Sequence, residues 1–143
     1  MNVIAYGSLM NQRSLEGTLN RRAELTPVTI EGYARVFNAP FDNYAFLNLR
    51  RTDNSRIECA YFEIEPIELT KFSVREAGSE LVELTSGLYA FMWPGDKAED
   101  LPVLMSYINV CQEASRQLEL DFIKGTVWPN ILEDDRMKPK YRA

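Results

Sequence analysis

The chain has 143 residues, a length typical of one domain with its own hydrophobic core. Apolar residues make up 45% of it and charged residues 26%, as in ordinary globular proteins. Its 21 acidic and 16 basic residues give a net charge of −5, which disfavours electrostatic binding to nucleic acid or to an anionic membrane. We therefore expect a single domain over residues 1–143, with neither nucleic acid nor membrane as a partner.

The chain contains no histidine, and this restricts its chemistry further. Ser-His-Asp and Cys-His nucleophilic catalysis are excluded, and zinc or iron sites are disfavoured. The two cysteines, Cys59 and Cys111, lack metal-type spacing, so we interpret them as core residues of a protein in a reducing compartment. No signal peptide or membrane-spanning run is visible, so we expect a cytoplasmic protein without metal or cofactor. Any proton transfer must rest on a carboxylate, a lysine or a tyrosine.

The N-terminal segment predicts a strand that turns into a helix. The apolar run Val3–Tyr6 is typical of a buried strand, and Gly7 and Ser8 end it. The spacing of Leu15 and Leu19 then predicts a helix over residues 11–19. Such a turn leaves free backbone N–H groups near the positive end of a helix dipole, which suits a carboxylate or a phosphate. The alternative, favoured by geometry alone, is an ordinary turn with no ligand.

The central part of the chain predicts most of a sheet. The alternation over residues 26–38 indicates a strand, interrupted at Gly32 by a bulge or a tight bend of the kind found where a sheet curls toward a barrel. Strands are also expected over residues 44–50 and 56–64. The turn-rich run Thr52–Ser55 between them predicts a hairpin.

The remaining segments complete an α+β pattern. Two strands are expected over residues 81–84 and 88–93, and a helix follows Pro102 with Ile108 and Cys111 on one face. The tail from residue 126 onward has no regular period. The fold class we predict is α+β, a small closed mixed β-barrel with flanking helices.

Glu76 is the residue whose placement is most unusual. Pro66 opens a predicted helix in which Leu69, Phe72 and Glu76 share one face, and Gly78 ends it. A carboxyl group on an apolar face and at the negative end of a helix has a raised pKa, in the range useful for accepting and returning a proton. The alternative is that the neighbouring arginine simply pairs with it.

Two other groups were considered for chemistry. Ser8 is a possible nucleophile only if Lys71 replaces the missing histidine, and hydrogen bonding is its more ordinary role. The acidic run Glu133–Asp135 could hold a cation, but a short acidic run is usually a solvated loop.

Three stretches resemble the gamma-glutamylcyclotransferase-like family, which includes the gamma-glutamylamine cyclotransferases. The run Ile4–Leu9 is similar to the family's Tyr-Gly-Ser loop, and Glu31–Phe37 is similar to its Gly-Tyr-x-x-x-Phe strand. The segment from Ala60–Ile64 to Arg75–Gly78 resembles the part of the family that ends in the catalytic glutamate. Order and spacing agree over residues 3 to 93.

The resemblance implies both a fold and an activity. It implies a closed barrel of about six strands with flanking helices, and release of 5-oxoproline from a gamma-glutamyl amide or peptide. Tyr6, Gly7, Ser8 and Leu9 would bind the substrate's carboxylate or carbonyl oxygen through backbone N–H groups. Glu76 would be the general acid/base. This chemistry agrees with the absence of histidine, because a gamma-glutamyl group carries its own amine nucleophile.

Two positions depart from the family's pattern. Ser79 stands where the family often has an aromatic residue, so Tyr107 or Tyr89 is expected to replace it, and we take Tyr107 as substrate-binding. Leu9 stands where many members have asparagine, which bears on substrate choice. Two alternatives stay open: a non-catalytic small-molecule-binding protein on the same scaffold, and a protein that binds a partner through its aromatic, basic tail.

Overall fold

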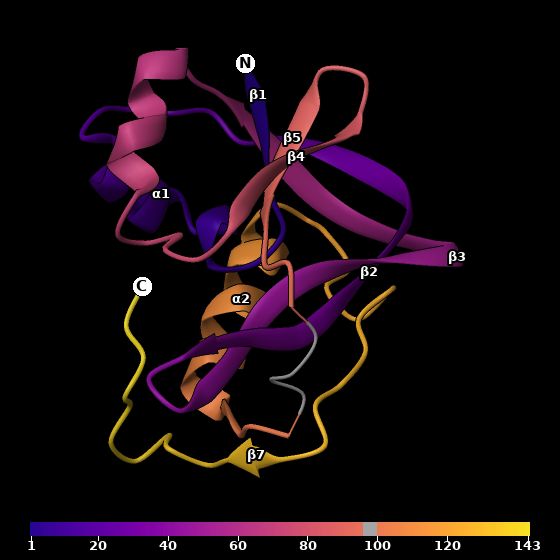
Figure 1. The fold of residues 1–143 in the computed structure, drawn as a ribbon. Helices are drawn as coiled ribbons and strands as arrows, with labels where there is room; N and C mark the ends of the chain where they lie inside the picture. The colour runs from indigo at the N-terminus through magenta and orange to yellow at the C-terminus, as the bar shows by residue number, and fades with distance from the viewer. Residues whose placement is uncertain (96–99) are drawn as a thin grey trace.

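A five-stranded mixed sheet forms the centre of the computed structural model, which describes residues 1–95 and 100–143 (Figure 1). The strand order is β2-β3-β1-β5-β4, so β1 lies in the middle, antiparallel to β3 and parallel to β5. The strands are β1 (Asn2–Ala5), β2 (Thr26–Phe41), β3 (Tyr44–Glu63), β4 (Glu80–Thr85) and β5 (Leu88–Met92). The expected first strand and the hairpin of β4 and β5 are confirmed.

The predicted closed barrel is wrong, because the sheet stays open. Its edges are β2 and β4, which do not pair with each other. The edge of β2 is instead paired with the C-terminal segment: Arg35 N donates to Gly125 O at 2.8 Å, and Val127 N donates to Arg35 O at 2.9 Å. At this position the edge backbone groups of β2 are satisfied by the C-terminal segment and not by another strand of the sheet.

The predicted hairpin around Thr52–Ser55 is also wrong. Strand β3 runs continuously through this segment and pairs with β2 on both sides of it, from Glu31↔Arg56 to Tyr33↔Arg51. The turn-type residues form a bulge, in which Asn54 has φ +63°. The bulge at Gly32, with φ +82°, is confirmed on the facing strand.

The true hairpin turn joins β2 to β3 through Asp42 and Asn43. Both residues have positive φ, 51° and 67°, as a two-residue type I′ turn requires. Such a turn matches the twist of the strands, so the long hairpin can extend well beyond the central sheet (Figure 1).

Two α-helices pack beside the sheet as the sequence predicts. The short 3₁₀ helix η1 (Ser8–Met10) leads into α1 (Gln12–Leu19), whose first turn is capped by Asn11 Oδ1 accepting from Ser14 N at 2.9 Å. Helix α2 (Met105–Gln117) follows β6 (Val103–Leu104), which pairs with β7 (Leu132–Glu133). Both cysteines are buried and free, as expected. Within the described ranges, no helix combines the length and the apolarity needed to cross a membrane.

The segment before Glu76 is a 3₁₀ helix, η2 (Pro66–Phe72), and not the longer helix expected. Glu76 lies beyond its end, in turns, with its N–H bonded to Phe72 O at 2.8 Å. Gly78, with φ +87°, ends these turns. The shared helical face of the prediction therefore stops at Phe72, which is fully buried and stacks on Phe62.

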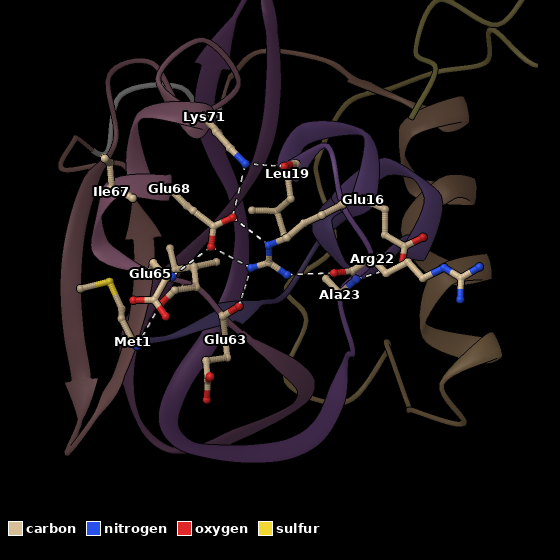
Figure 2. Close-up of polar contacts among 12 residues, drawn as sticks. Met1, Glu16, Leu19, Arg22, Ala23, Glu63, Glu65, Ile67, Glu68 and Lys71 are labelled. Atoms are coloured by element: carbon tan, nitrogen blue, oxygen red, sulfur yellow. Dashed lines mark hydrogen bonds and ion pairs between the residues drawn. The ribbon is translucent and has the colours of Figure 1, made fainter.

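An ion-pair network fastens η2 to the end of α1 (Figure 2). Arg21 binds both carboxylate oxygens of Glu68 at 2.8 Å, a bidentate geometry. Lys71 Nζ donates to Leu19 O at 2.6 Å and also reaches Glu68. Hydrogen bonds from Arg21 and from the Glu65 backbone hold the pKa of Glu68 at about 2. The network fixes the segment that leads to Glu76. It also binds the ammonium group of Lys71, the residue that the sequence offered as an activator of Ser8.

Candidate active site

All six residues predicted for the site line one cavity of about 750 Å³. It is bounded by the turn after β1, the turns before β4, the tip of the β2–β3 hairpin, the start of α2 and the C-terminal tail. The six are Tyr6, Gly7, Ser8, Leu9, Glu76 and Tyr107. The structure thus brings together segments that are up to a hundred residues apart in sequence.

The Gly7–Leu9 turn offers backbone donors to this cavity. The first hydrogen bond of η1 runs from Met10 N to Gly7 O at 3.0 Å, so the N–H groups of Ser8 and Leu9 have no acceptor within the helix. Neighbouring side chains approach Gly7 closely: a Cβ there would lie 3.2 Å from the Tyr107 hydroxyl and 3.3 Å from Leu47 Cδ1, so both would have to shift. Two such N–H groups can bind a carboxylate or an oxyanion.

A buried arginine, Arg35, binds the backbone at the start of this turn. Its side chain is fully buried, and Nε donates to the Tyr6 carbonyl oxygen at 2.7 Å. Nη2 donates to Glu58 O, and the guanidinium lies 4.9 Å from the centre of the Phe122 ring. In a trans peptide the C=O and the following N–H point in opposite directions, so the Gly7 N–H points away from Arg35. Arg35 therefore fixes the first peptide of the turn.

The carboxyl group of Glu76 is poised for proton transfer. Burial raises its pKa to about 7, and Arg75 opposes part of this shift. Burial raises the pKa of Tyr6 and of Tyr141, and the Glu76 charge adds to both shifts, which places Glu76 near both hydroxyls. The sequence predicted two causes for a raised pKa of Glu76. Burial is confirmed as a cause, whereas the negative end of a helix is not, because η2 ends at Phe72. A carboxyl with this pKa can both accept and return a proton near neutrality.

The guanidinium of Arg75 joins the two halves of the site. Nη2 donates to Ser8 Oγ at 2.9 Å, and Nη1 donates to Ser14 Oγ at 2.5 Å and to Thr18 Oγ1 at 3.1 Å. The guanidinium of Arg75 thus binds η1 and α1, and not the Glu76 carboxylate as the alternative interpretation of the sequence held. These bonds hold the Glu76 turn against the Gly7–Leu9 turn.

Solved structures share this arrangement of elements. No protein-family model matches the sequence, and no curated protein matches it. A gamma-glutamyl cyclotransferase structure matches with a TM-score of 0.69 at 9% identity, over 81% of this chain and 78% of that one. The chain has a gamma-glutamyl cyclotransferase-like fold.

The same fold occurs in proteins whose function is not described. An uncharacterized protein from Homo sapiens matches with a TM-score of 0.64 at 11% identity, over 81% of this chain and 78% of that one. YkqA from Bacillus subtilis matches with a TM-score of 0.65 at 15% identity, over 82% of this chain but only 48% of its own length. At these identities the likeness shows the gamma-glutamyl cyclotransferase-like fold and not an activity.

The aromatic hydroxyls of the site differ from the sequence expectation. Tyr107 lines the cavity, but its hydroxyl accepts a hydrogen bond from Leu47 N at 3.1 Å. Tyr89 is not among the lining residues, and its hydroxyl interacts with Glu83. The C-terminal tail instead contributes Tyr141.

Arg35 and Tyr141 are the site residues that sequence reasoning missed. The sequence does carry a signal for Arg35, because a charged residue stands there within the apolar run around Val36. For Tyr141 the tail offered only its aromatic and basic character, without any spacing to interpret.

The acidic run Glu133–Asp135 has three separate partners. Glu133 pairs with Lys140 at 2.6 Å, Asp134 pairs with Arg136 at 2.6 Å, and Asp135 accepts from Ser106. Among residues 1–95 and 100–143, no group of three or more histidine, cysteine or acidic residues could hold a metal ion.

Proposed function

We propose that this chain is a gamma-glutamyl cyclotransferase that releases 5-oxoproline from a gamma-glutamyl amide, with residues 1–143 acting as one domain. One observation carries the proposal: Glu76, with a pKa of about 7, shares a cavity with the N–H groups of Ser8 and Leu9, which have no acceptor within η1. The resemblance in fold to a gamma-glutamyl cyclotransferase supports it.

The proposed reaction is an intramolecular acyl transfer. Glu76 accepts a proton from the substrate's α-amino group as its nitrogen attacks the side-chain carbonyl carbon. The new C–N bond closes the five-membered ring, and the carbonyl oxygen becomes an oxyanion held by the N–H groups of Ser8 and Leu9. Collapse breaks the bond to the leaving amine, which takes the proton back from Glu76. The products are 5-oxoproline and a free amine, and no water is consumed.

The barrier can be lowered enough without a protein nucleophile. Holding the amine against the carbonyl in ring-closing geometry contributes as much as about 7–11 kcal/mol in favourable intramolecular cases. A positioned carboxyl adds about 10²–10⁴-fold. A chain without histidine therefore has all the groups that the reaction needs.

The cavity also limits the leaving group. Phe41, Phe46, Phe91 and Trp93 give it an apolar wall, and Lys140 and Asp42 lie at the hairpin-tip side. An apolar wall with single charges at its rim accepts an amino acid, a dipeptide or a small amine as the leaving group. The substrates to be tested are therefore gamma-glutamyl derivatives of these three classes.

The test is release of 5-oxoproline from a panel of gamma-glutamyl amides by the wild type, Glu76→Gln and Glu80→Gln. Glu80 is an exposed neighbour at the start of β4, so its variant is a matched control. We expect activity in the wild type and the control, and a loss of about 10²–10⁴-fold in Glu76→Gln. A folded wild type that is inert across the panel would favour a binding protein. Full activity of Glu76→Gln would disprove the assigned role.

A further inference from the structure

Residues 135–141 of the C-terminal tail are fastened to the start of α2. Asp135, which is buried, accepts hydrogen bonds from Ser106 N at 2.9 Å, from Ser106 Oγ at 2.5 Å and from Lys140 N at 2.8 Å. Tyr141 N then donates to Ser106 Oγ at 3.2 Å. Figure 1 shows the tail, in yellow, leaving β7 and turning back toward the middle of the molecule. The backbone of Tyr141 is therefore held in a fixed position.

The ring of Tyr141 is packed as firmly as its backbone. It meets the Tyr107 ring edge-to-face at 4.9 Å and 86°, and it lies 5.9 Å from the Phe46 ring. Edge-to-face packing of this kind stabilises a defined ring orientation. The hydroxyl is thus presented to the cavity by a rigid ring.

The surroundings of the Tyr141 hydroxyl place it at the charged end of the cavity. Burial raises its pKa, a hydrogen bond with Ser8 and the charge of Arg75 lower it, and the charge of Glu76 raises it. The net shift is upward, so the hydroxyl keeps its proton at neutral pH. The Tyr141 hydroxyl faces Ser8, Arg75 and Glu76, which themselves line the cavity.

The hydrogen bonds at this end run in one direction. Arg75 donates to Ser8 Oγ at 2.9 Å, so the Ser8 hydroxyl hydrogen points elsewhere. Ser8 lowers the pKa of Tyr141, as a hydroxyl that donates to the Tyr141 oxygen would. The hydrogen of Tyr141 is then available to a ligand. A chain that starts at a guanidinium polarises each successive hydroxyl, so its last hydrogen is a stronger donor.

We propose that the Tyr141 hydroxyl, at the end of the chain from Arg75 through Ser8, donates to the α-carboxylate of the substrate's glutamyl group. The inference rests on the proposed function and deepens it, because it assigns different groups to the substrate's carboxylate and to the oxyanion of the reaction. The Tyr141 hydroxyl holds the permanent carboxylate, and the N–H groups of the turn are left for the oxyanion. Specificity for an acidic α-substituent then depends on a residue of the tail.

The test compares binding of 5-oxoproline and its uncharged amide, 5-oxoprolinamide, by calorimetry or NMR titration. The proteins are the wild type, Tyr141→Phe and Tyr61→Phe; Tyr61 lies on β3 outside the cavity and is the matched control. We expect the wild type and the control to prefer 5-oxoproline. Tyr141→Phe should bind 5-oxoproline about tenfold more weakly, with binding of the amide unchanged.

Three results would overturn the inference. They are wild-type affinity for 5-oxoproline in Tyr141→Phe, an equal loss for both ligands in that variant, and binding of neither ligand by the wild type. Because binding needs no turnover, the two proposals fail separately. A carboxylate preference that Tyr141→Phe removes, in a protein that releases no 5-oxoproline, supports the carboxylate site and refutes the enzyme. Turnover with an unchanged KM in Tyr141→Phe refutes only the role of Tyr141.

Discussion

Nε of Arg35 donates a 2.7 Å hydrogen bond to the carbonyl oxygen of Tyr6, from a side chain with no exposed surface. Every oxygen that this guanidinium contacts belongs to the backbone, in residues 6, 58 and 122. A buried cation that donates to three backbone carbonyl groups orders the strand ends around it and keeps a positive charge next to the Gly7–Leu9 turn.

Arg35→Met should destabilise the protein and Arg35→Lys should do so less. Methionine leaves the Tyr6 and Glu58 carbonyls without donors, at about 1–3 kcal/mol each, whereas lysine keeps the charge but loses the planar fork. Urea unfolding measures both. Arg51→Met is the control, because Arg51 is exposed and only approaches the Tyr33 ring at 5.9 Å. Equal stability of Arg35→Met and wild type would contradict the assigned role.

Replacement of Glu76 by glutamine should stabilise the protein in a pH-dependent way. The folded-state pKa of about 7 lies above the ordinary value of 4.5, so ionisation is easier in the unfolded chain. The contribution of Glu76 to stability is complete below pH 4.5 and is lost as the pH rises through 7. Above pH 7, the difference in free energy of unfolding between Glu76→Gln and the wild type should be about 3 kcal/mol more in favour of the variant than it is at pH 4. Urea unfolding at several pH values measures this, and a difference that does not vary with pH would refute it.

Glu68 should show the opposite dependence. Its pKa of about 2 in the folded protein lies below the ordinary 4.5, so its contribution is present above pH 4.5 and is lost as the pH falls through 2. We expect the wild type to be more stable than Glu68→Gln at pH 7, with the gap closing in acid. Glu24→Gln, at an exposed site, is the matched control. A gap that persists at pH 2 would mean that the network of Figure 2 acts through packing and not through charge.

Alanine at two glycines should have opposite effects. At Gly7 the new Cβ would press on the Tyr107 hydroxyl and on Leu47, so Gly7→Ala should cost about 1–3 kcal/mol and impair 5-oxoproline release. At Gly17, in α1, no atom lies within 4 Å, and Gly17→Ala should gain about 0.5–1 kcal/mol. Thermal unfolding of both variants checks the signs. A tolerated Gly7→Ala with normal activity would show that the close approach is not needed.

Local signals in the sequence identified the elements but not how they join. The first strand, the bulge at Gly32 and the helix capped by Asn11 depend on neighbouring residues, and they were predicted correctly. The edge of β2 pairs at Arg35 with residues 125–127, about ninety positions away, and no local pattern encodes this contact. The bulge over Thr52–Ser55 has the same composition as a turn, so only its pairing partner distinguishes the two.

The site divides in the same way. The Tyr6–Leu9 turn, Glu76 and Tyr107 were selected from local features and from the family resemblance, and the structure gathers them in one cavity. The catalytic and binding roles given to them stay predictions. Arg35 and Tyr141 owe their positions to long-range contacts, with the Tyr6 carbonyl in one case and with Ser106 in the other. Sequence reasoning had no means of placing them.

The bulged β2–β3 hairpin separates two kinds of evolutionary constraint. Its inner half belongs to the central sheet, whereas Phe41 and Asp42 at its tip line the mouth of the cavity, with Phe41 68% exposed. Substitutions or insertions at the tip can reshape the entrance without disturbing the strands that carry the Gly7–Leu9 turn. A few tip residues can thus change which molecules enter the cavity, while the scaffold behind them is kept intact.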